Sequence, residues 1–210
     1  MDPPSPAGDR TRVRESFRRE GTAARYRKER FPPRRARSEQ RAVARLLPGL
    51  APGRRLDLAC GAGRFGTLLA REGPVVGVDS SAGMLAEARA EGAYAALLCG
   101  DAFQLPFRDG AFAGALCVRL LPHFGPEDRR RVLAELRRVV RGRAVVSFFD
   151  AATLEALRAR RKRTRGASRR AIRLREFEED LAATGWRLAR LSRKLGRVTE
   201  HVFALLEAAP

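Results

Sequence analysis

One short stretch constrains the fold of this 210-residue chain more than any other: an apolar segment, a glycine turn and a helix start at residues 55–67. Leu56 and Leu58 alternate as in a strand, and Gly61 and Gly63 can adopt backbone angles closed to other residues. Glycine also lets a ligand approach the backbone without meeting a Cβ atom. After the second glycine the pattern becomes helical. A strand that turns on glycines into a helix predicts a nucleotide-binding corner.

Acidic residues accompany three successive predicted strands. The glycines fit the dinucleotide pattern G-x-G-x-x-G, a weak signal alone, at Gly61, Gly63 and Gly66. Asp57 lies inside the strand before the turn, where a buried carboxylate needs a cationic or donor-rich partner. Asp79 closes the next strand, roughly 20 residues after the first glycine, where an acid can bind ribose hydroxyls. Asp101 follows a third apolar strand, residues 95–99.

Four segments carry this pattern through about the first half of a fold: Leu56–Gly63, Val76–Leu85, Gly100–Ala102 and Leu105–Phe112. In this order they resemble the motifs of class I S-adenosylmethionine-dependent methyltransferases. The resemblance implies an α/β fold with a doubly wound, mostly parallel seven-stranded sheet. Helices would cover both faces of the sheet, and the last strand would be antiparallel.

The resemblance also implies which residues hold S-adenosylmethionine and the product S-adenosylhomocysteine. Asp57 would face the methionyl amine, Asp79 the ribose hydroxyls, and Asp101 with Ala102 the adenine edge. The remaining cofactor contacts would come from the glycine turn and the next helix: Ala59, Gly61, Gly63, Ser80 and Met84. The sequence departs from the family pattern at Ala59, where many relatives have glycine, and at Ala113, where many have an acid.

Periodicity and turn signals predict the remaining elements. The expected helices are 38–47, one from residue 64, 81–90 with Ser80 or Ser81 as cap, one from Pro126 to Gly142, and 174–184. The expected later strands are 113–118, 144–149, 186–192 and 198–206. We expect one methyltransferase domain at 34–210, after a basic arm or cofactor lid at 1–33 in which Tyr26 or Phe31 could cover the cofactor.

The formal net charge of +19 allows two interpretations. It is compatible with nucleic-acid binding. However, nearly all the basic residues are arginine, a skew that a GC-rich genome produces without any binding function. A dense basic run at 158–170 is predicted to lie near the acceptor side as a loop or helix insertion. There it either recognises anionic groups or is simply solvated.

Cysteine usage and hydropathy suggest a cytoplasmic protein. Three cysteines, Cys60, Cys99 and Cys117, lie at or near apolar strands without C-x-x-C spacing, which predicts buried thiols and no metal site. No apolar run reaches the length needed to span a membrane.

Methyl transfer from a sulfonium mainly requires alignment, with a general base only if the acceptor must lose a proton. Open α/β sheets bind ligands beyond the carboxyl ends of their strands, which places the acceptor near residues 119–124 and 150–153. His123 is the candidate base, or else a residue that shapes the turn. Arg119 could meet an anionic acceptor or form a salt bridge, and His201 is interpreted as structural.

Other functions remain open from the sequence alone. An NAD(P)-dependent oxidoreductase would share the glycine pattern, but no hydride-transfer set such as Tyr-x-x-x-Lys is present. A nucleic-acid-binding or nucleic-acid-methylating protein would use the arginine-rich surface. No aromatic residues are interleaved with the basic run for base stacking, so a small or lipid-like acceptor, anionic or neutral, is favoured.

Overall fold

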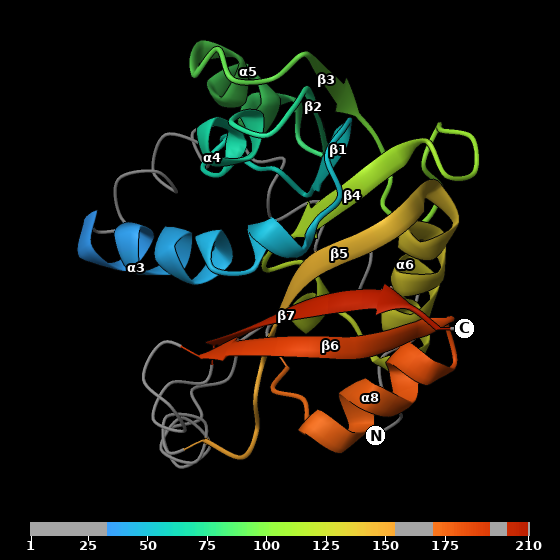
Figure 1. Cartoon of the computed structure of the whole chain (residues 1–210). Coiled ribbons are helices and arrows are strands. Elements are labelled where there is room, and N and C mark those ends of the chain that lie inside the picture. The colour runs from blue at the N-terminus through green and yellow to red at the C-terminus, as the bar shows by residue number, and fades with distance from the viewer. Residues whose placement is uncertain (1–32, 154–169, 194–200, 210) are drawn as a thin grey trace, which may run out of the picture.

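A seven-stranded sheet organises the protein in the computed structural model, which describes residues 33–153, 170–193 and 201–209 (Figure 1). The strands are β1 Arg55–Leu58, β2 Val75–Asp79, β3 Ala96–Cys99, β4 Phe112–Cys117, β5 Val140–Phe149, β6 Trp186–Arg193 and β7 His201–Ala208. Their order is β3-β2-β1-β4-β5-β7-β6. The first five strands pair in parallel, and β7 runs antiparallel to both β5 and β6. The predicted fold class is confirmed.

Helices cover both faces of the sheet (Figure 1). One face carries α3 Pro33–Ala44, α4 Gly66–Ala70 and α5 Ala82–Ala90, and the other carries α6 Pro126–Val139 and α8 Leu174–Ala182. Short 3-10 turns, η1 Leu47–Gly49 and η2 Leu121–His123, complete the described elements. Each layer has its own apolar cluster, with Val43 and Leu69 in the first and Leu133 and Phe177 in the second. Two separate cores are expected of a sheet that is buried on both sides.

The edge strand β3 corrects one expectation about the cysteines. Cys60 and Cys117 are buried as predicted, but Cys99 is exposed. β3 has a neighbour on one side only, and its residues are only partly covered. An apolar run therefore did not guarantee burial here, because edge position decides how much of a strand is covered.

Several predicted helix boundaries were also wrong, among them both ends of α3, which stops at Ala44 rather than residue 47, the start of α4 and the end of α6. α3 begins at Pro33 rather than residue 38, since proline needs no hydrogen bond for its nitrogen in a first helical turn. α4 begins at Gly66, so residues 59–65 form a longer turn than expected.

Gly142 does not end α6, because β5 begins directly at Val140 and continues through it. A Cβ at Gly142 would lie 2.6 Å from the carbonyl oxygen of Ala113, where the β4–β5 register shifts. Close backbone approach thus explains this glycine. The cap of α5 is as predicted, since the Ser81 hydroxyl accepts a hydrogen bond from the Met84 amide.

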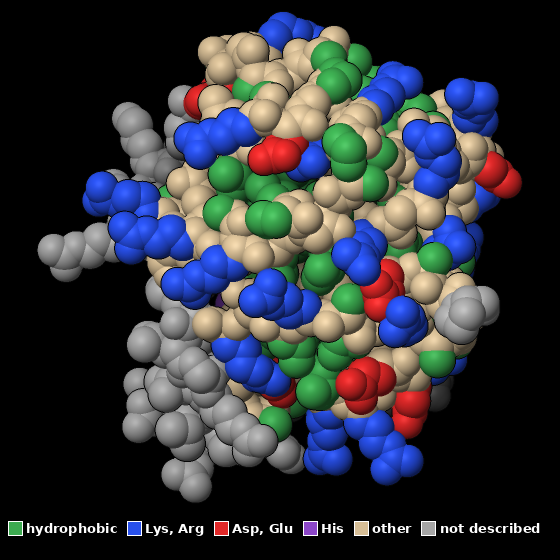
Figure 2. Space-filling model, viewed as in Figure 1, with side chains coloured by type: hydrophobic (Ala, Val, Ile, Leu, Met, Phe, Trp, Pro, Cys, Tyr) green, Lys and Arg blue, Asp and Glu red, His purple; other side chains and the backbone are tan. Residues whose placement is uncertain are grey.

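Arginine side chains are spread over the face that carries α3 and the β6–β7 ribbon (Figure 2). Arg37 and Arg41 are exposed on α3, Arg45 is exposed directly after it, and Arg187 and Arg190 are exposed on β6. The basic run at 158–170 and the candidate lid residues Tyr26 and Phe31 fall almost entirely outside the described residues. Among the helices that the structure describes, none combines the length and apolar character needed to cross a membrane.

Candidate active site

The order of the strands changes sense between β1 and β4: β2 and β3 lie on one side of β1, and β4 and β5 on the other. Open α/β sheets bind ligands at such a switch point. Ala59 follows β1 with φ of 58°, and Arg119 follows β4 with φ of 67°. Within the described ranges, these are the two non-glycine residues in the left-handed region. Strained backbone of this kind clusters at functional sites. The geometry therefore marks the carboxyl ends of β1 and β4 as the candidate site.

Asp79 joins the glycine turn to the start of α5. Its Oδ2 accepts a hydrogen bond from the Gly61 amide and its Oδ1 one from the Ser81 amide, both at 2.9 Å. The Ser80 amide also donates to this carboxylate, so of its roughly four acceptor sites about one remains for a ribose hydroxyl. Burial raises the pKa of Asp79, and the amide donors Ser81, Gly61 and Ser80 oppose that rise.

Asp57 is buried beneath the glycine turn and accepts a 2.7 Å hydrogen bond from the Tyr94 hydroxyl. Burial raises the pKa of Asp57 to about 7, against the hydrogen bond from Tyr94 and the charge of Arg64. The negative charge of Asp79 adds to the rise. A cation brought near would favour the charged carboxylate and lower this pKa. The two acids thus form a region suited to an ammonium group, and the predicted contact of Asp57 with the methionyl amine stays a prediction.

Tyr94 explains the glycine at Gly66, where a Cβ would lie 2.6 Å from its ring. The ring also lies close to Gly77 of β2, at 2.9 Å from a Cβ there, although the Leu97 side chain is nearer at 2.6 Å. Gly63 is required by its φ of 82° and by the Ala88 backbone, 3.0 Å from a Cβ. A Cβ at Gly61 would meet nothing within 4 Å, so Gly61 faces open space that a ligand can occupy.

The other predicted cofactor residues lie around the same edge. Ser80 and Ala102 are partly buried, whereas Met84 is almost fully buried in α5. Asp101 accepts a 3.0 Å hydrogen bond from the Phe103 amide, which orders the turn after β3. The structure brings these residues to the ends of β2 and β3, and their contacts with adenine or ribose stay predictions.

On the other side of the switch point, Glu39 gathers three basic side chains. This carboxylate, on α3 and 3% exposed, pairs with Arg64 of the glycine turn and with Arg119 after β4. It also lies 3.3 Å from Nδ1 of His201. Burial would raise the pKa of Glu39, but the hydrogen bonds from His201 and Arg119 and the charge of Arg64 hold it far below its ordinary value. We call these four residues the Glu39 cluster.

The edge around the ends of β4 and β5, where the acceptor is predicted to bind, is called the acceptor side and contains the other predicted residues. His123 is half-buried in η2, and the Arg119 amide donates to Ser147 Oγ at 2.9 Å. Asp150, after β5, accepts a 2.6 Å ion-pair hydrogen bond from Arg193. Buried Cys117 has a raised pKa, as expected of a thiol that is no nucleophile. Arg119 forms a salt bridge with Glu39, one of its two predicted interactions, whereas contact of Arg119 with an acceptor and a general-base role for His123 stay predictions.

Sequence reasoning missed Tyr94 and Glu39. Gly77, inside a strand, was an available signal, because glycine within a strand marks close approach by another group. Glu39 gave a weaker one, an acid on the apolar side of a predicted amphipathic helix. Nothing local indicated that its partners would be Arg64, Arg119 and His201.

Residues 56–143 match the family model described as a methyltransferase domain. The demethylmenaquinone methyltransferase of Thermotoga maritima is 38% identical over 109 residues, 50% of this chain and 47% of that protein. The 2-phytyl-1,4-naphtoquinone methyltransferase of Synechocystis is 36% identical over 121 residues, 52% of this chain and 50% of that protein. The chain thus spans about half the length of these curated relatives.

Among solved structures, the magnesium protoporphyrin IX methyltransferase of Synechocystis with bound S-adenosylhomocysteine superposes with a TM-score of 0.77. The match covers 95% of this chain and 100% of that one at 20% identity, so it shows the fold. The motif resemblance and the domain match concern the same residues. Residues 56–143 therefore form a methyltransferase domain, in a chain with the fold of the class I S-adenosylmethionine-dependent methyltransferases.

Proposed function

We propose that the protein transfers the methyl group of S-adenosylmethionine to a small, lipid-like ring compound. The observation that carries the proposal is the sheet order, in which antiparallel β7 lies between β5 and β6. The common dinucleotide-binding sheet has the order 3-2-1-4-5-6 instead. This difference favours a methyltransferase over an NAD(P)-dependent oxidoreductase with the same glycine pattern.

The residues at the switch point fit the cofactor. Asp79 offers acceptor capacity for the ribose, and the open space at Gly61 admits a ligand next to the backbone. The raised pKa values of Asp57 and Asp79 suit a site completed by a cationic ligand. When bound, the cofactor supplies an already activated methyl group. The protein would then mainly orient the acceptor and exclude water.

The acceptor class is inferred from the relatives. Two curated relatives are named for naphthoquinone-type compounds, and the solved neighbour for a porphyrin. All of these are ring compounds. A sulfonium methyl group needs an electron-rich partner, so the reduced, hydroquinone form of such a ring is the expected nucleophile.

The cofactor assignment is tested by thermal unfolding with S-adenosylhomocysteine, NAD and NADP. A ligand at 100 times its dissociation constant adds about 2.7 kcal/mol, or a rise of about 5–10 °C for a chain of this size. We expect a rise with S-adenosylhomocysteine alone. A rise with only a dinucleotide would overturn the proposal, and no rise at all would favour a nucleic-acid-binding protein.

Turnover tests the acceptor class separately. The methyl donor carries a radiolabel, and the acceptors are 1,4-dihydroxynaphthalene kept reduced, its oxidised quinone, and a short RNA duplex. Label should appear in the reduced naphthalene only. Transfer to RNA instead would replace the lipid-like acceptor with the nucleic-acid alternative.

A further inference from the structure

His201, interpreted as structural from the sequence, has the surroundings of an oriented base. It is the first residue of β7, and its side chain is 9% exposed between the rings of Phe149 and Phe203. Nδ1 lies 3.3 Å from Oε1 of Glu39. Nε2 is buried and, among the described residues, has no hydrogen-bond partner. A buried, unsatisfied acceptor atom is costly and calls for an explanation.

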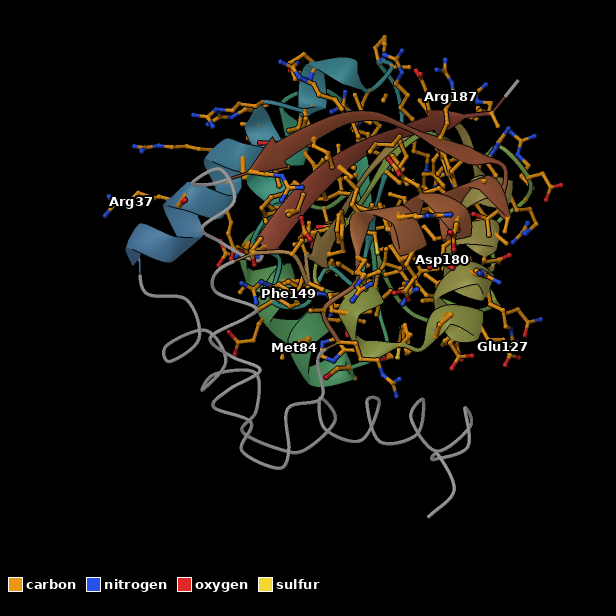
Figure 3. All side chains as sticks on the ribbon, turned by 90° about the horizontal axis from the view of Figure 1, so that it is seen from below. Arg37, Met84, Glu127, Phe149, Asp180 and Arg187 are labelled. Carbon is orange, nitrogen blue, oxygen red and sulfur yellow. The ribbon has the colours of Figure 1, made fainter. Side chains whose placement is uncertain are left out.

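The position of His201 connects it with the candidate site. It pairs across the sheet with Phe149, the last residue of β5, which is labelled in Figure 3. The carboxylate that contacts His201 also pairs with Arg64 of the glycine turn and Arg119 at the end of β4. Segments that follow β1 and β4 therefore meet the end of β5 and the start of β7 at the ligand-binding edge.

The protonation state follows from these contacts. Burial lowers the pKa of His201 to about 4, and the charges of Arg119 and Arg64 act in the same direction, whereas Glu39 opposes them. The ring is thus neutral at pH 7 and carries one proton. The Glu39 carboxylate accepts that proton's hydrogen bond at Nδ1, which leaves the lone pair on Nε2.

We propose that His201, oriented by Glu39, is the group that accepts a hydroxyl proton from the methyl acceptor. This inference rests on the proposed methyltransferase function and assigns the acceptor to the hydroxylated aromatic compounds. A base held by a second group that fixes its tautomer is the arrangement that activates nucleophiles in many enzymes. The hydroxyl donor would satisfy Nε2, the atom that the described protein leaves unpaired.

The proposed step balances without a further reactant. The O–H bond of the acceptor breaks, its proton moves to Nε2, and the electron pair left on the acceptor forms the bond to methyl. The methyl–sulfur bond breaks, and its electron pair remains on the sulfur as the neutral thioether. Glu39 stabilises the imidazolium until the proton passes to water.

Nuclear magnetic resonance of 15N-labelled histidine tests the dyad independently of any acceptor. The chain has two histidines, so a spectrum of His123→Gln assigns the signals. We expect neutral His201 at pH 7 with the proton on Nδ1. A proton on Nε2, or a charged ring at pH 7, would overturn the proposal even if the methyltransferase assignment is correct.

Ligand binding tests the role of Nε2. With S-adenosylhomocysteine present, 1-naphthol should bind roughly 3- to 10-fold more tightly than naphthalene, as one neutral hydrogen bond predicts. The preference should disappear in His201→Phe. Equal affinities of the wild-type protein for the two probes would contradict the inference. Failure of S-adenosylhomocysteine to bind would contradict the proposed function instead. The tautomer of His201, measured by nuclear magnetic resonance, would then still show whether Glu39 orients the ring.

Kinetics with reduced 1,4-dihydroxynaphthalene distinguish a base from a packing residue. In His201→Gln, kcat should fall about 100-fold or more while KM changes little. The remaining kcat should rise with pH toward the pKa of the free hydroxyl, about 10. Glu39→Gln should lower kcat in the same way if the variant folds. Leu205→Ala, on the same face of β7, removes packing but no base and should keep the wild-type pH profile. An unchanged profile in His201→Gln would refute a base role.

Discussion

The two halves of the ligand-binding edge are built in different ways. On the cofactor side, Asp79 bonds to Gly61, 18 residues away, and to Ser81, two residues away. On the acceptor side, Glu39 meets Arg119 across 80 residues and His201 across 162. Around Asp79, the cofactor side thus relies on backbone donors within one continuous motif. The acceptor side is made of ionisable side chains from distant parts of the chain.

This difference separates cofactor binding, which many chains share, from acceptor recognition, which differs between them. Backbone amides and glycines can serve any chain that binds the same cofactor, and their spacing persists as a motif. Ionisable side chains from α3, from the segment after β4 and from β7 lie outside that motif and can be exchanged separately from it. The acceptor side is therefore where such a chain can acquire its own specificity.

The largest expected effect is loss of the Glu39 carboxylate. Glu39→Ala leaves Arg64 and Arg119 without their shared carboxylate, and breaking a buried ion pair costs about 3–5 kcal/mol. Chemical denaturation should show this drop in the free energy of unfolding. Glu179→Ala, whose partner Arg175 is also exposed and lies 3.3 Å away, should cost far less. Equal costs would mean that the Glu39 cluster does not hold the acceptor side together.

The next effect concerns the cofactor side and should appear in binding. Asp79→Ala removes the acceptor of two amide hydrogen bonds as well as the predicted ribose contact. We expect affinity for S-adenosylhomocysteine to fall about 100-fold, because hydrogen bonds to charged groups contribute about 1.5–3 kcal/mol each. Calorimetric titration measures it, with exposed Asp109→Ala as control. Unchanged affinity in Asp79→Ala would remove Asp79 from the site.

A third test probes the packing under the glycine turn. Gly66→Ala would place a Cβ 2.6 Å from the Tyr94 ring, whose hydroxyl is held by Asp57. Overpacking of this kind costs about 1–3 kcal/mol of unfolding free energy. Tyr94→Ala in the same chain should make the added methyl group nearly neutral. Full additivity of the two changes would show that Tyr94 does not account for the glycine.

The sequence predicted the cofactor side and most of the fold because their signals are local. Strand and helix periodicity, the glycine spacing and the acids after three strands all lie within short segments. Gly142 misled because a glycine after a helix resembles a cap, whereas here a neighbouring backbone requires it. The Glu39 cluster could not be predicted, since pairing across 162 residues leaves no local pattern.

The contributions of Asp57 and His201 to the free energy of unfolding should change in opposite directions with pH. Asp57 has a folded-state pKa of about 7 against an ordinary 3.8, so its contribution to stability falls as pH rises from about 4 to 7. His201, at about 4 against 6.5, makes stability rise with pH over nearly the same range.

When either group is removed, the slope of the free energy of unfolding against pH should report the contribution of the other group. His201→Gln should make that slope more negative and Asp57→Asn more positive, each by at most about 1.4 kcal/mol per pH unit. Denaturant midpoints between pH 4 and 7 measure both slopes. Shifts of the same sign would contradict the assignment of opposite pKa changes to the two sides.

The smallest effect compares the two strained residues directly. Ala59 and Arg119 both have left-handed backbone angles, at φ of 58° and 67°, but only Arg119 has a side chain that pairs with Glu39. Ala59→Gly should raise the free energy of unfolding by about 0.5–1 kcal/mol, because glycine adopts this conformation without steric cost. Arg119→Gly gains the same relief but loses the buried ion pair, so it should be destabilising overall. Ala62→Gly, at a position outside the left-handed region, controls for the added chain entropy and should lower stability. If Ala59→Gly were also destabilising, the left-handed backbone at Ala59 would not be a source of strain in this protein.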